Sequence, residues 1–220
     1  MLSIRFLTII SFIFTLGLNF NAFAQDETVS DGRLGIEEII VTGTKRDISQ
    51  QDVPIAVSTI TEQQLENTFR NDVFALGQLA PNVTLTPQNG FNAIAGGMRG
   101  TGFISILVTK DPSVGIVVDD FAFNHVQAQA IEMFDMEQVE IYRGPQGTLF
   151  GKNTTGGAIA FTTKKPVLGE TTFDVEATYG QYASNDASIE KINAAINFPI
   201  GDKLAVRISV IQDEEEGYWT

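Results

Sequence analysis

The sequence predicts a small α+β domain followed by the first antiparallel strands of a transmembrane β-barrel, truncated before the barrel could close. Three observations lead to this fold class. An apolar segment at the N-terminus marks the chain for export. Short strand and helix patterns are mixed over residues 47–166, which is typical of an α+β domain. Long segments of alternating hydrophobicity then fill residues 167–220, as in outer-membrane barrels.

Residues 1–24 are predicted to be a signal peptide. Arg5 gives the positive start, Phe6–Leu18 is the apolar centre, and Ala22–Ala24 is a small-x-small cleavage site before Gln25. The alternative is a membrane anchor, but a spanning helix needs about 20 apolar residues. Export of a chain without cysteine indicates a bacterial envelope protein rather than a disulfide-stabilised secreted module.

Composition argues against several classes of function. The chain has 14 Lys and Arg against 27 Asp and Glu, a net charge of −13, so it lacks the basic character of nucleic-acid-binding proteins. His125 is the only histidine and cysteine is absent, so a Cys/His zinc site and a cysteine nucleophile are impossible within this chain. We expect neither a metal site nor a cofactor. Asp119 and Asp120 could suggest a carboxylate dyad, but without a second motif they are better explained as a strand-ending turn.

The elements expected in the α+β domain follow one another closely. Asp52–Ile60 is β-prone with a proline near its start, which suits an edge strand. Thr61 and Gln64 form a capping box that begins a short helix. Asp72 can cap a second helix, which stops before Pro81. Further strands are expected in Val114–Phe121, Glu137–Gly144 and Gly157–Pro166, and glycine-rich loops between short strands are expected in Thr86–Ser105.

Residues 167–220 have a different hydrophobic pattern. Apolar residues occupy every second position in Thr172–Gly180, Lys191–Phe198 and Leu204–Gln212. The alternative to a barrel is an ordinary antiparallel sheet with one solvated face, but the export signal and the long strands favour a barrel. Three strands cannot close a barrel, and lipid tolerates no open sheet edge. We therefore expect this chain to be a fragment of a longer protein.

The glycine-rich stretch "GPQGTLFGKNTTGG", Gly144–Gly157, first suggests a phosphate loop of the form G-x-x-x-x-G-K-[ST]. Gly151 and Lys152 can be aligned with its G-K. The first glycine of the motif then falls on Gln146 and its hydroxyl residue on Asn153. Because two required positions fail, nucleotide binding is not supported.

Together with its flanks, the stretch "MEQVEIYRGPQGTLFGKNTTGGAIAFTTKKP" (Met136–Pro166) resembles the plug domain of TonB-dependent outer-membrane receptors. That family commonly carries a run of the type VE-x-x-RGPQG-x-L-x-G-x-N-x-x-GG-x-I. Other similar pieces occur in the right order, namely "VPIAVSTIT", "LAPNV", "GMRG" and "VGIVVDDF". The run "IEEIIVTGTK" resembles the TonB box, the energy-coupling segment of the family. The resemblance covers Ile36–Thr220.

The resemblance implies a globular plug, residues 47–166, inside the lumen of a barrel in the outer membrane of a Gram-negative bacterium. Residues 25–46 would be a flexible tail with the TonB box, and residues 167–220 would be the first three barrel strands or so. Only Gln25–Gly35 lie between the cleavage site and the box, too few to bury a core, so no extra signalling domain is expected there.

In function, the resemblance implies a receptor and not an enzyme, which takes up a scarce, large ligand. A ferric siderophore is the first choice, and haem, cobalamin and glycans are alternatives. The implied partners are the TonB–ExbB–ExbD complex, driven by the proton gradient, and outer-membrane lipid, with no nucleic acid. The rival interpretation is a soluble periplasmic or secreted α+β ligand-binding protein with a β-rich tail.

The resemblance also implies three sets of site residues. The TonB box comprises Glu38, Ile39, Ile40, Val41 and Thr42. It is β-prone and could pair with a partner strand, although it could also be an ordinary first strand of the plug. Ion pairs between plug and barrel are expected at Arg99, Glu140 and Arg143, which could otherwise be solvated surface residues. Ligand contacts are expected in three loops, at Gln88, Asn89, Phe91, Phe103, Phe123, Asn124 and His125. His125 could equally be an ordinary loop histidine.

Overall fold

The computed structural model describes residues 39–45, 48–68, 72–87, 93–103, 110–182 and 187–215. These residues belong to one compact unit, Glu38–Thr220. The predicted signal peptide and most of the predicted tail lie outside the described residues. Within these ranges, no helix is both long enough and apolar enough to cross a membrane.

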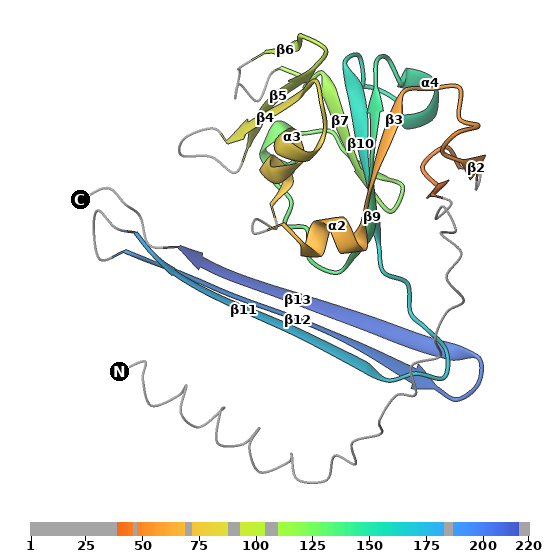
Figure 1. The fold of residues 1–220 in the computed structure, drawn as a ribbon, viewed down its shortest axis with the longest axis vertical. Helices are drawn as coiled ribbons and strands as arrows, with labels where there is room; N and C mark the ends of the chain where they lie inside the picture. The colour runs from red at the N-terminus through yellow and green to blue at the C-terminus, as the bar shows by residue number, and fades with distance from the viewer. Residues whose placement is uncertain are drawn as a thin grey trace, which may run out of the picture. The chain divides into compact units, whose positions relative to one another are not determined.

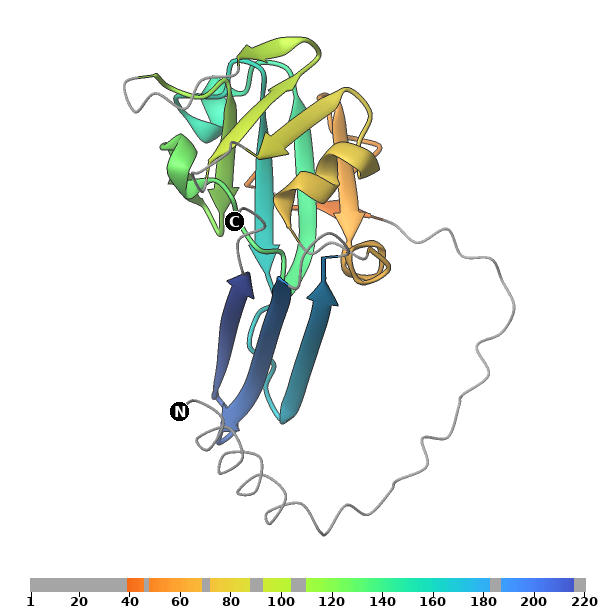
Figure 2. The same ribbon diagram turned by 90° about the vertical axis from the view of Figure 1, so that its left-hand side faces the viewer.

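A five-stranded sheet of order β3-β9-β10-β7-β8 forms the centre of the α+β part (Figures 1 and 2). Its strands are β3 (Val57–Thr61), β7 (Val114–Val118), β8 (Phe121–Phe123), β9 (Met136–Arg143) and β10 (Gly157–Thr163). β10 pairs with β7 in parallel, and the other pairs are antiparallel. β3 lies at the edge, as the proline near its start predicted.

Both predicted helices form where their caps are placed. Helix α2 (Glu62–Glu66) follows Thr61, whose backbone N–H donates to Gln64 Oε1 at 3.2 Å. Asp72 accepts the backbone N–H of Ala75 at 3.2 Å. A 3₁₀ turn, η1 (Val73–Ala75), begins there and continues as α3 (Leu76–Leu79), which ends before Pro81. The elements that were not predicted include two short helical ones, the 3₁₀ turn η2 (Val126–Ala128) and the helix α4 (Gly147–Phe150) inside the glycine-rich stretch.

The turn between β7 and β8 confirms the structural interpretation of the paired aspartates. Asp119 and Asp120 have φ angles of 45° and 70°, in the left-handed region that aspartate tolerates better than most residues. The Asp119 carboxylate accepts the backbone N–H of Thr163 at 3.0 Å and its hydroxyl at 2.7 Å. The first aspartate therefore fastens this turn to the end of β10.

The central sheet is buried on both faces. Val139 and Ile141 of β9 belong to a large apolar cluster with Leu76 and Phe161. Because neighbours along a strand point to opposite faces, Tyr142 lies on the other side. There it joins a smaller cluster, which contains Val41, Val53, Ala158 and Ala160. The N-terminal segment thus covers the second face of the sheet.

Two smaller sheets complete the α+β part. One contains β4 (Val83–Pro87), β5 (Ile94–Met98) and β6 (Thr101–Phe103), in that order. The other is the pair β1 (Ile40–Val41) and β2 (Ile48–Ser49), which is antiparallel. The β-prone run at the N-terminus therefore supplies a strand of two residues only.

Three long strands form a separate antiparallel sheet, called the wall strands below (Figure 1). They are β11 (Thr172–Gln181), β12 (Ser188–Ile200) and β13 (Leu204–Glu215). The register places Phe173 opposite Ile196 and Ile196 opposite Ile208, so the predicted apolar positions share one face. This face is exposed, with Phe173 at 69% and Ile208 at 57%. The predicted alternation is confirmed.

Candidate functional site

The turn after β1 contacts the buried carboxylate of Glu140, which lies on the central strand β9 and is 0% exposed. The backbone N–H of Thr42 donates to Oε1 at 2.6 Å, and that of Gly43 donates to Oε2 at 2.7 Å. Two successive amides of the N-terminal segment thus hold both oxygens of one carboxylate. Hydrogen bonds to an ionised acceptor are among the stronger ones in proteins.

Two side chains of β9 complete the surroundings of Glu140. The Tyr142 hydroxyl donates to Oε2 at 2.8 Å, and Gln138 Nε2 donates to Oε1 at 3.0 Å. Gln138 Nε2 also lies 3.0 Å from the hydroxyl oxygen of Thr42. No Lys or Arg of the described segments forms a recorded ion pair with Glu140. Four hydrogen bonds from neutral donors thus reach this buried carboxylate, and such bonds lower the cost of burying a polar group.

The Tyr142 hydroxyl stays protonated and acts as a hydrogen-bond donor to Glu140. Burial raises the pKa of its phenol, and the charge of Glu140 and the hydrogen bond to that carboxylate raise it further. The hydroxyl therefore keeps its proton over the physiological range, and its bond to Glu140 persists.

Gly43 allows the close approach of the segment to Glu140. A Cβ atom at this position would lie less than 3.0 Å from Glu140 Oε2 and 2.8 Å from the Tyr142 hydroxyl. Both neighbours are fully buried and cannot move aside freely. Val41, two residues earlier, is also fully buried, beside Val53 and Tyr142. The segment Val41–Gly43 is therefore fitted to the sheet by both packing and hydrogen bonds.

The structure describes four of the five residues predicted for the TonB box, and Glu38 lies outside the described residues. Ile40 and Val41 pair with Ser49 and Ile48, the arrangement of an ordinary first strand. The Ile39 carbonyl accepts the backbone N–H of Gln50 at 2.9 Å. Ile40 is 49% exposed, in contrast to the buried Val41. The role of this segment in energy coupling stays a prediction.

The two predicted plug arginines lie near one another. Arg143 donates to the Pro81 carbonyl at 3.1 Å and to Ser58 Oγ at 2.9 Å, so its guanidinium is engaged within the α+β part. Burial lowers the pKa of Arg143, and the charge of Arg99 lowers it further. Arg99 has a left-handed φ of 54° in the turn between β5 and β6. Among the described residues, neither arginine forms an ion pair with a carboxylate of the wall strands. Ion pairing with the barrel stays a prediction for both arginines and for Glu140.

The predicted ligand loops are described only in part. Gln88, Asn89 and Phe91 lie outside the described residues. Phe103 ends β6, and Phe123 ends β8. The Asn124 carbonyl accepts Asn153 Nδ2 at 3.1 Å, while His125 Nδ1 accepts the backbone N–H of Gln127 at 3.4 Å. His125 thus caps η2, the role of an ordinary loop histidine, and ligand contact stays a prediction.

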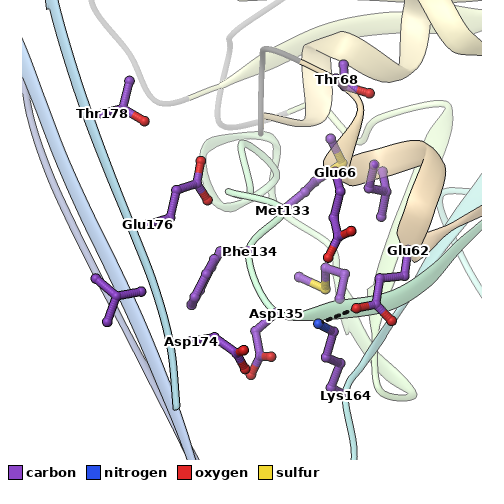
Figure 3. A pocket seen from close by; sticks show the side chains of 13 residues that line it. Glu62, Glu66, Thr68, Met133, Phe134, Asp135, Lys164, Asp174, Glu176 and Thr178 are labelled. Carbon is purple, nitrogen blue, oxygen red and sulfur yellow. Dashed lines mark ion pairs between the residues drawn. The ribbon is translucent and has the colours of Figure 1, made fainter. Parts of the chain in front are cut away.

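A second charged site was not predicted from the sequence; here carboxylates of the α+β part meet cations of the wall strands. Asp135, just before β9, binds Arg207 of β13, and Glu132 binds Lys191 of β12. A cavity of about 460 Å³ lies beside Asp135 (Figure 3). Its labelled lining includes the acidic residues Glu62, Glu66, Asp174 and Glu176 as well as Lys164. The only sequence signal was the presence of cations at polar positions of the alternating strands.

A model of one protein family, the TonB-dependent Receptor Plug Domain, matches residues 49–158. The chain is 27% identical to the Iron-regulated outer membrane virulence protein of Vibrio cholerae, over 94% of this chain and 32% of that protein. It is 26% identical to the Ferrioxamine B receptor of Salmonella typhimurium, over 77% of this chain and 23% of that protein. The chain spans a third or less of the length of these curated relatives.

Solved structures with the same fold include the siderophore receptor PiuA from Acinetobacter baumannii. It matches with a TM-score of 0.61 and 22% identity, over 83% of this chain and 24% of that chain. The alcaligin outer-membrane receptor FauA from Bordetella pertussis matches with a TM-score of 0.60 and 20% identity, over 80% of this chain and 29% of that chain. At these identities the likeness concerns the fold, an α+β domain followed by antiparallel strands.

Proposed function

The chain belongs to the TonB-dependent receptor plug domain family, and from this premise we propose that the complete protein is an outer-membrane receptor for energy-coupled uptake of a ferric siderophore. The observation that carries the coupling part is the attachment of the N-terminal segment to Glu140. The siderophore part is supported by the names of the relatives, which include a ferrioxamine B receptor and siderophore receptors. Such a receptor binds and moves its ligand and is not an enzyme.

We infer that residues 25–46 carry the coupling segment, residues 47–166 form the plug, and residues 167–220 begin the barrel wall. The sheet of the plug ends with β10 at Thr163, and the first wall strand begins at Thr172. Asn197 supports the linker between them. Its side-chain amide donates to the carbonyls of Val167 and Glu170 at 2.9 and 2.6 Å and accepts the N–H of Val167 at 3.0 Å.

Coupling would begin at the Glu38–Thr42 segment. A partner strand could pair with these residues in place of β2, through the main-chain hydrogen bonds that β-augmentation also uses. Displacement of β1 withdraws the amides of Thr42 and Gly43 from Glu140 and uncovers Tyr142. A pull from the N-terminus therefore reaches the central strand β9 directly.

The rival function, a soluble ligand-binding protein, is not supported by the wall strands. Their apolar face exposes Phe173, Phe198, Leu204, Ile208 and Val210, each more than half exposed. A soluble monomer rarely leaves so continuous an apolar face in water, whereas lipid would cover it in a barrel wall.

The test is transport by cells that carry the complete receptor as their only candidate iron receptor. We would offer ⁵⁵Fe-labelled ferrioxamine B and ferric enterobactin, with labelled cobalamin as a comparison ligand. We expect uptake of one of the ferric chelates, in cells with TonB and not in cells without it. Uptake of cobalamin alone would refute the siderophore part, and uptake without TonB would refute the coupling.

A deletion variant separates binding from coupling. Removal of Ile39–Val41 should abolish uptake and leave ligand binding to the cell surface unchanged, because none of the predicted ligand contacts belongs to this segment. The exposed surface substitution Lys152→Glu is the matched control and should keep both. Full uptake after the deletion would show that these residues are an ordinary strand of the plug.

A further inference from the structure

Asp135 and Arg207 form a nearly buried ion pair between the plug and the wall strands. Arg207 Nε lies 3.0 and 2.9 Å from the two Asp135 oxygens, and Nη2 lies 2.5 Å from Oδ1. The two side chains are 9% and 6% exposed. Ser209 Oγ also donates to Asp135 Oδ2. One plug carboxylate is therefore held by three donor groups from a single wall strand.

A second, more exposed pair reinforces the first. Lys191 Nζ of β12 lies 3.4 Å from Glu132 Oε1 and 2.6 Å from Asp213 Oδ2 of the neighbouring strand. Lys191 and Arg207 both lie on the polar face of the wall strands, opposite the face that carries Ile196 and Ile208. Glu132 and Asp135 are three residues apart, so one short segment of the plug meets two wall strands.

We propose that these two plug carboxylates seat the plug on the wall, with Asp135 on Arg207 as the principal contact and Glu132 on Lys191 as the second. Neither carboxylate is among Arg99, Glu140 and Arg143, the residues at which the family resemblance implied ion pairs between plug and barrel. The proposal concerns placement of the plug and does not depend on the ligand or on TonB coupling.

The surroundings of Asp135 explain why this contact fixes the position of the plug. Its backbone carbonyl accepts the N–H of Lys164 at 3.0 Å, and the residue directly precedes β9. The carboxylate is thus anchored to the ends of both central strands, β9 and β10. Any other seat of the plug would separate Asp135 from Arg207 and Ser209, and a buried carboxylate without a partner is strongly unfavourable.

Charges rather than continuous packing hold this region together. The cavity beside Asp135 leaves the plug and β11 incompletely packed against each other (Figure 3). The carboxylates of Asp135 and Asp174 approach each other there, and both bind Arg207 Nη2, at 2.5 and 3.0 Å. A planar guanidinium that holds two carboxylates defines a direction as well as a distance. Such a contact is suited to set the orientation of the plug.

The test uses the complete receptor in outer membranes and in planar lipid bilayers. Asp135→Arg should open the lumen, seen as ion conductance and as new chymotrypsin cleavage within the plug. Heat-modifiable migration in detergent gels reports separately that the barrel has folded. The double variant Asp135→Arg with Arg207→Asp restores opposite charges at the contact, and we expect it to regain the seal.

The control is Lys152→Glu, which reverses a charge of the plug in an exposed pair with Asp111 and should leave the lumen sealed. A sealed Asp135→Arg variant, or a double variant as leaky as the single one, would overturn the proposal. If Asp135→Arg prevents barrel folding, Asp135→Asn removes the charge and keeps the shape. Conductance and protease resistance equal to wild type in that variant would likewise overturn it.

Discussion

Substitution of Gly43 by alanine is the most direct perturbation of the attachment between the N-terminal segment and Glu140. The added Cβ would lie less than 3.0 Å from Glu140 Oε2 and 2.8 Å from the Tyr142 hydroxyl. Because both side chains are fully buried, we expect the segment to move away instead. This movement removes the hydrogen bonds of 2.6 and 2.7 Å from Thr42 and Gly43 to the carboxylate.

The expected magnitude follows from those two bonds. A hydrogen bond to a charged group contributes about 1.5–3 kcal/mol. Loss of both therefore favours local opening by about 3 kcal/mol or more, a factor of about 100 in the opening equilibrium. The amides of residues 41–43 should exchange their hydrogens faster by this factor, while β9 and β10 keep their protection.

Hydrogen–deuterium exchange with mass spectrometry of the complete receptor measures this effect. Gly147→Ala is the matched control, because a Cβ at Gly147 meets nothing within 4 Å. It should leave exchange at residues 41–43 unchanged. Wild-type protection of that segment in Gly43→Ala would refute the conclusion that the segment is held tightly against Glu140. Equal acceleration over β9 would show instead that the substitution disrupts the whole sheet.

Three further predictions concern single side chains. In Glu140→Gln, an NH₂ group replaces one carboxylate oxygen and faces an N–H donor that binds this oxygen in the wild type. We therefore expect faster hydrogen exchange at residues 41–43 without loss of the folded sheet. Unchanged exchange would contradict this prediction. Asn197→Ala leaves backbone groups of the linker without their partner and should lower the free energy of unfolding by about 2–4 kcal/mol in urea titrations. Asn193→Ala on the same strand is the control. The buried Oδ1 of Asn193 has no hydrogen-bond partner among the described residues, so this substitution should lower the free energy of unfolding less. Burial raises the pKa of Asp135, but the hydrogen bonds and charge of Arg207 outweigh it and lower the pKa below 3.8. The stabilising contribution of Asp135 is therefore complete above that pH and lost as the pH falls through the lower folded-state pKa, so the stability gap between wild type and Asp135→Asn should close in acid; a gap independent of pH would refute this.

Elements with local signals could be predicted from the sequence. Thr61 and Gln64 lie within one helical turn of each other, and Asp119 and Asp120 are adjacent in one tight turn. The alternation in the wall strands is equally local, because the period of a β-strand alone decides which face a residue occupies. Such features need no knowledge of distant partners.

Contacts across long separations could not be predicted in the same way. Thr42 and Glu140 are 98 positions apart, and the donors to the carboxylate from the N-terminal segment are backbone amides, which leave no trace in the side-chain pattern. Arg207 and Asp135 are 72 positions apart. The cations of the wall strands were visible at polar positions, but their partners became apparent only when the segment before β9 was placed beside them.

The structure also bears on the two alternatives for the N-terminal segment, a coupling element or an ordinary first strand. β1 has only two residues, and its attachment depends on the burial of Val41 and on the two bonds to Glu140. Burial of a valine side chain contributes about 1.5–3 kcal/mol, and the two bonds add about 3–6 kcal/mol at about 1.5–3 kcal/mol each. A partner with a dissociation constant of 1 μM provides about 8 kcal/mol, which is of the same order as this attachment. We therefore propose that the same residues are an ordinary strand at rest and a coupling element when a partner binds.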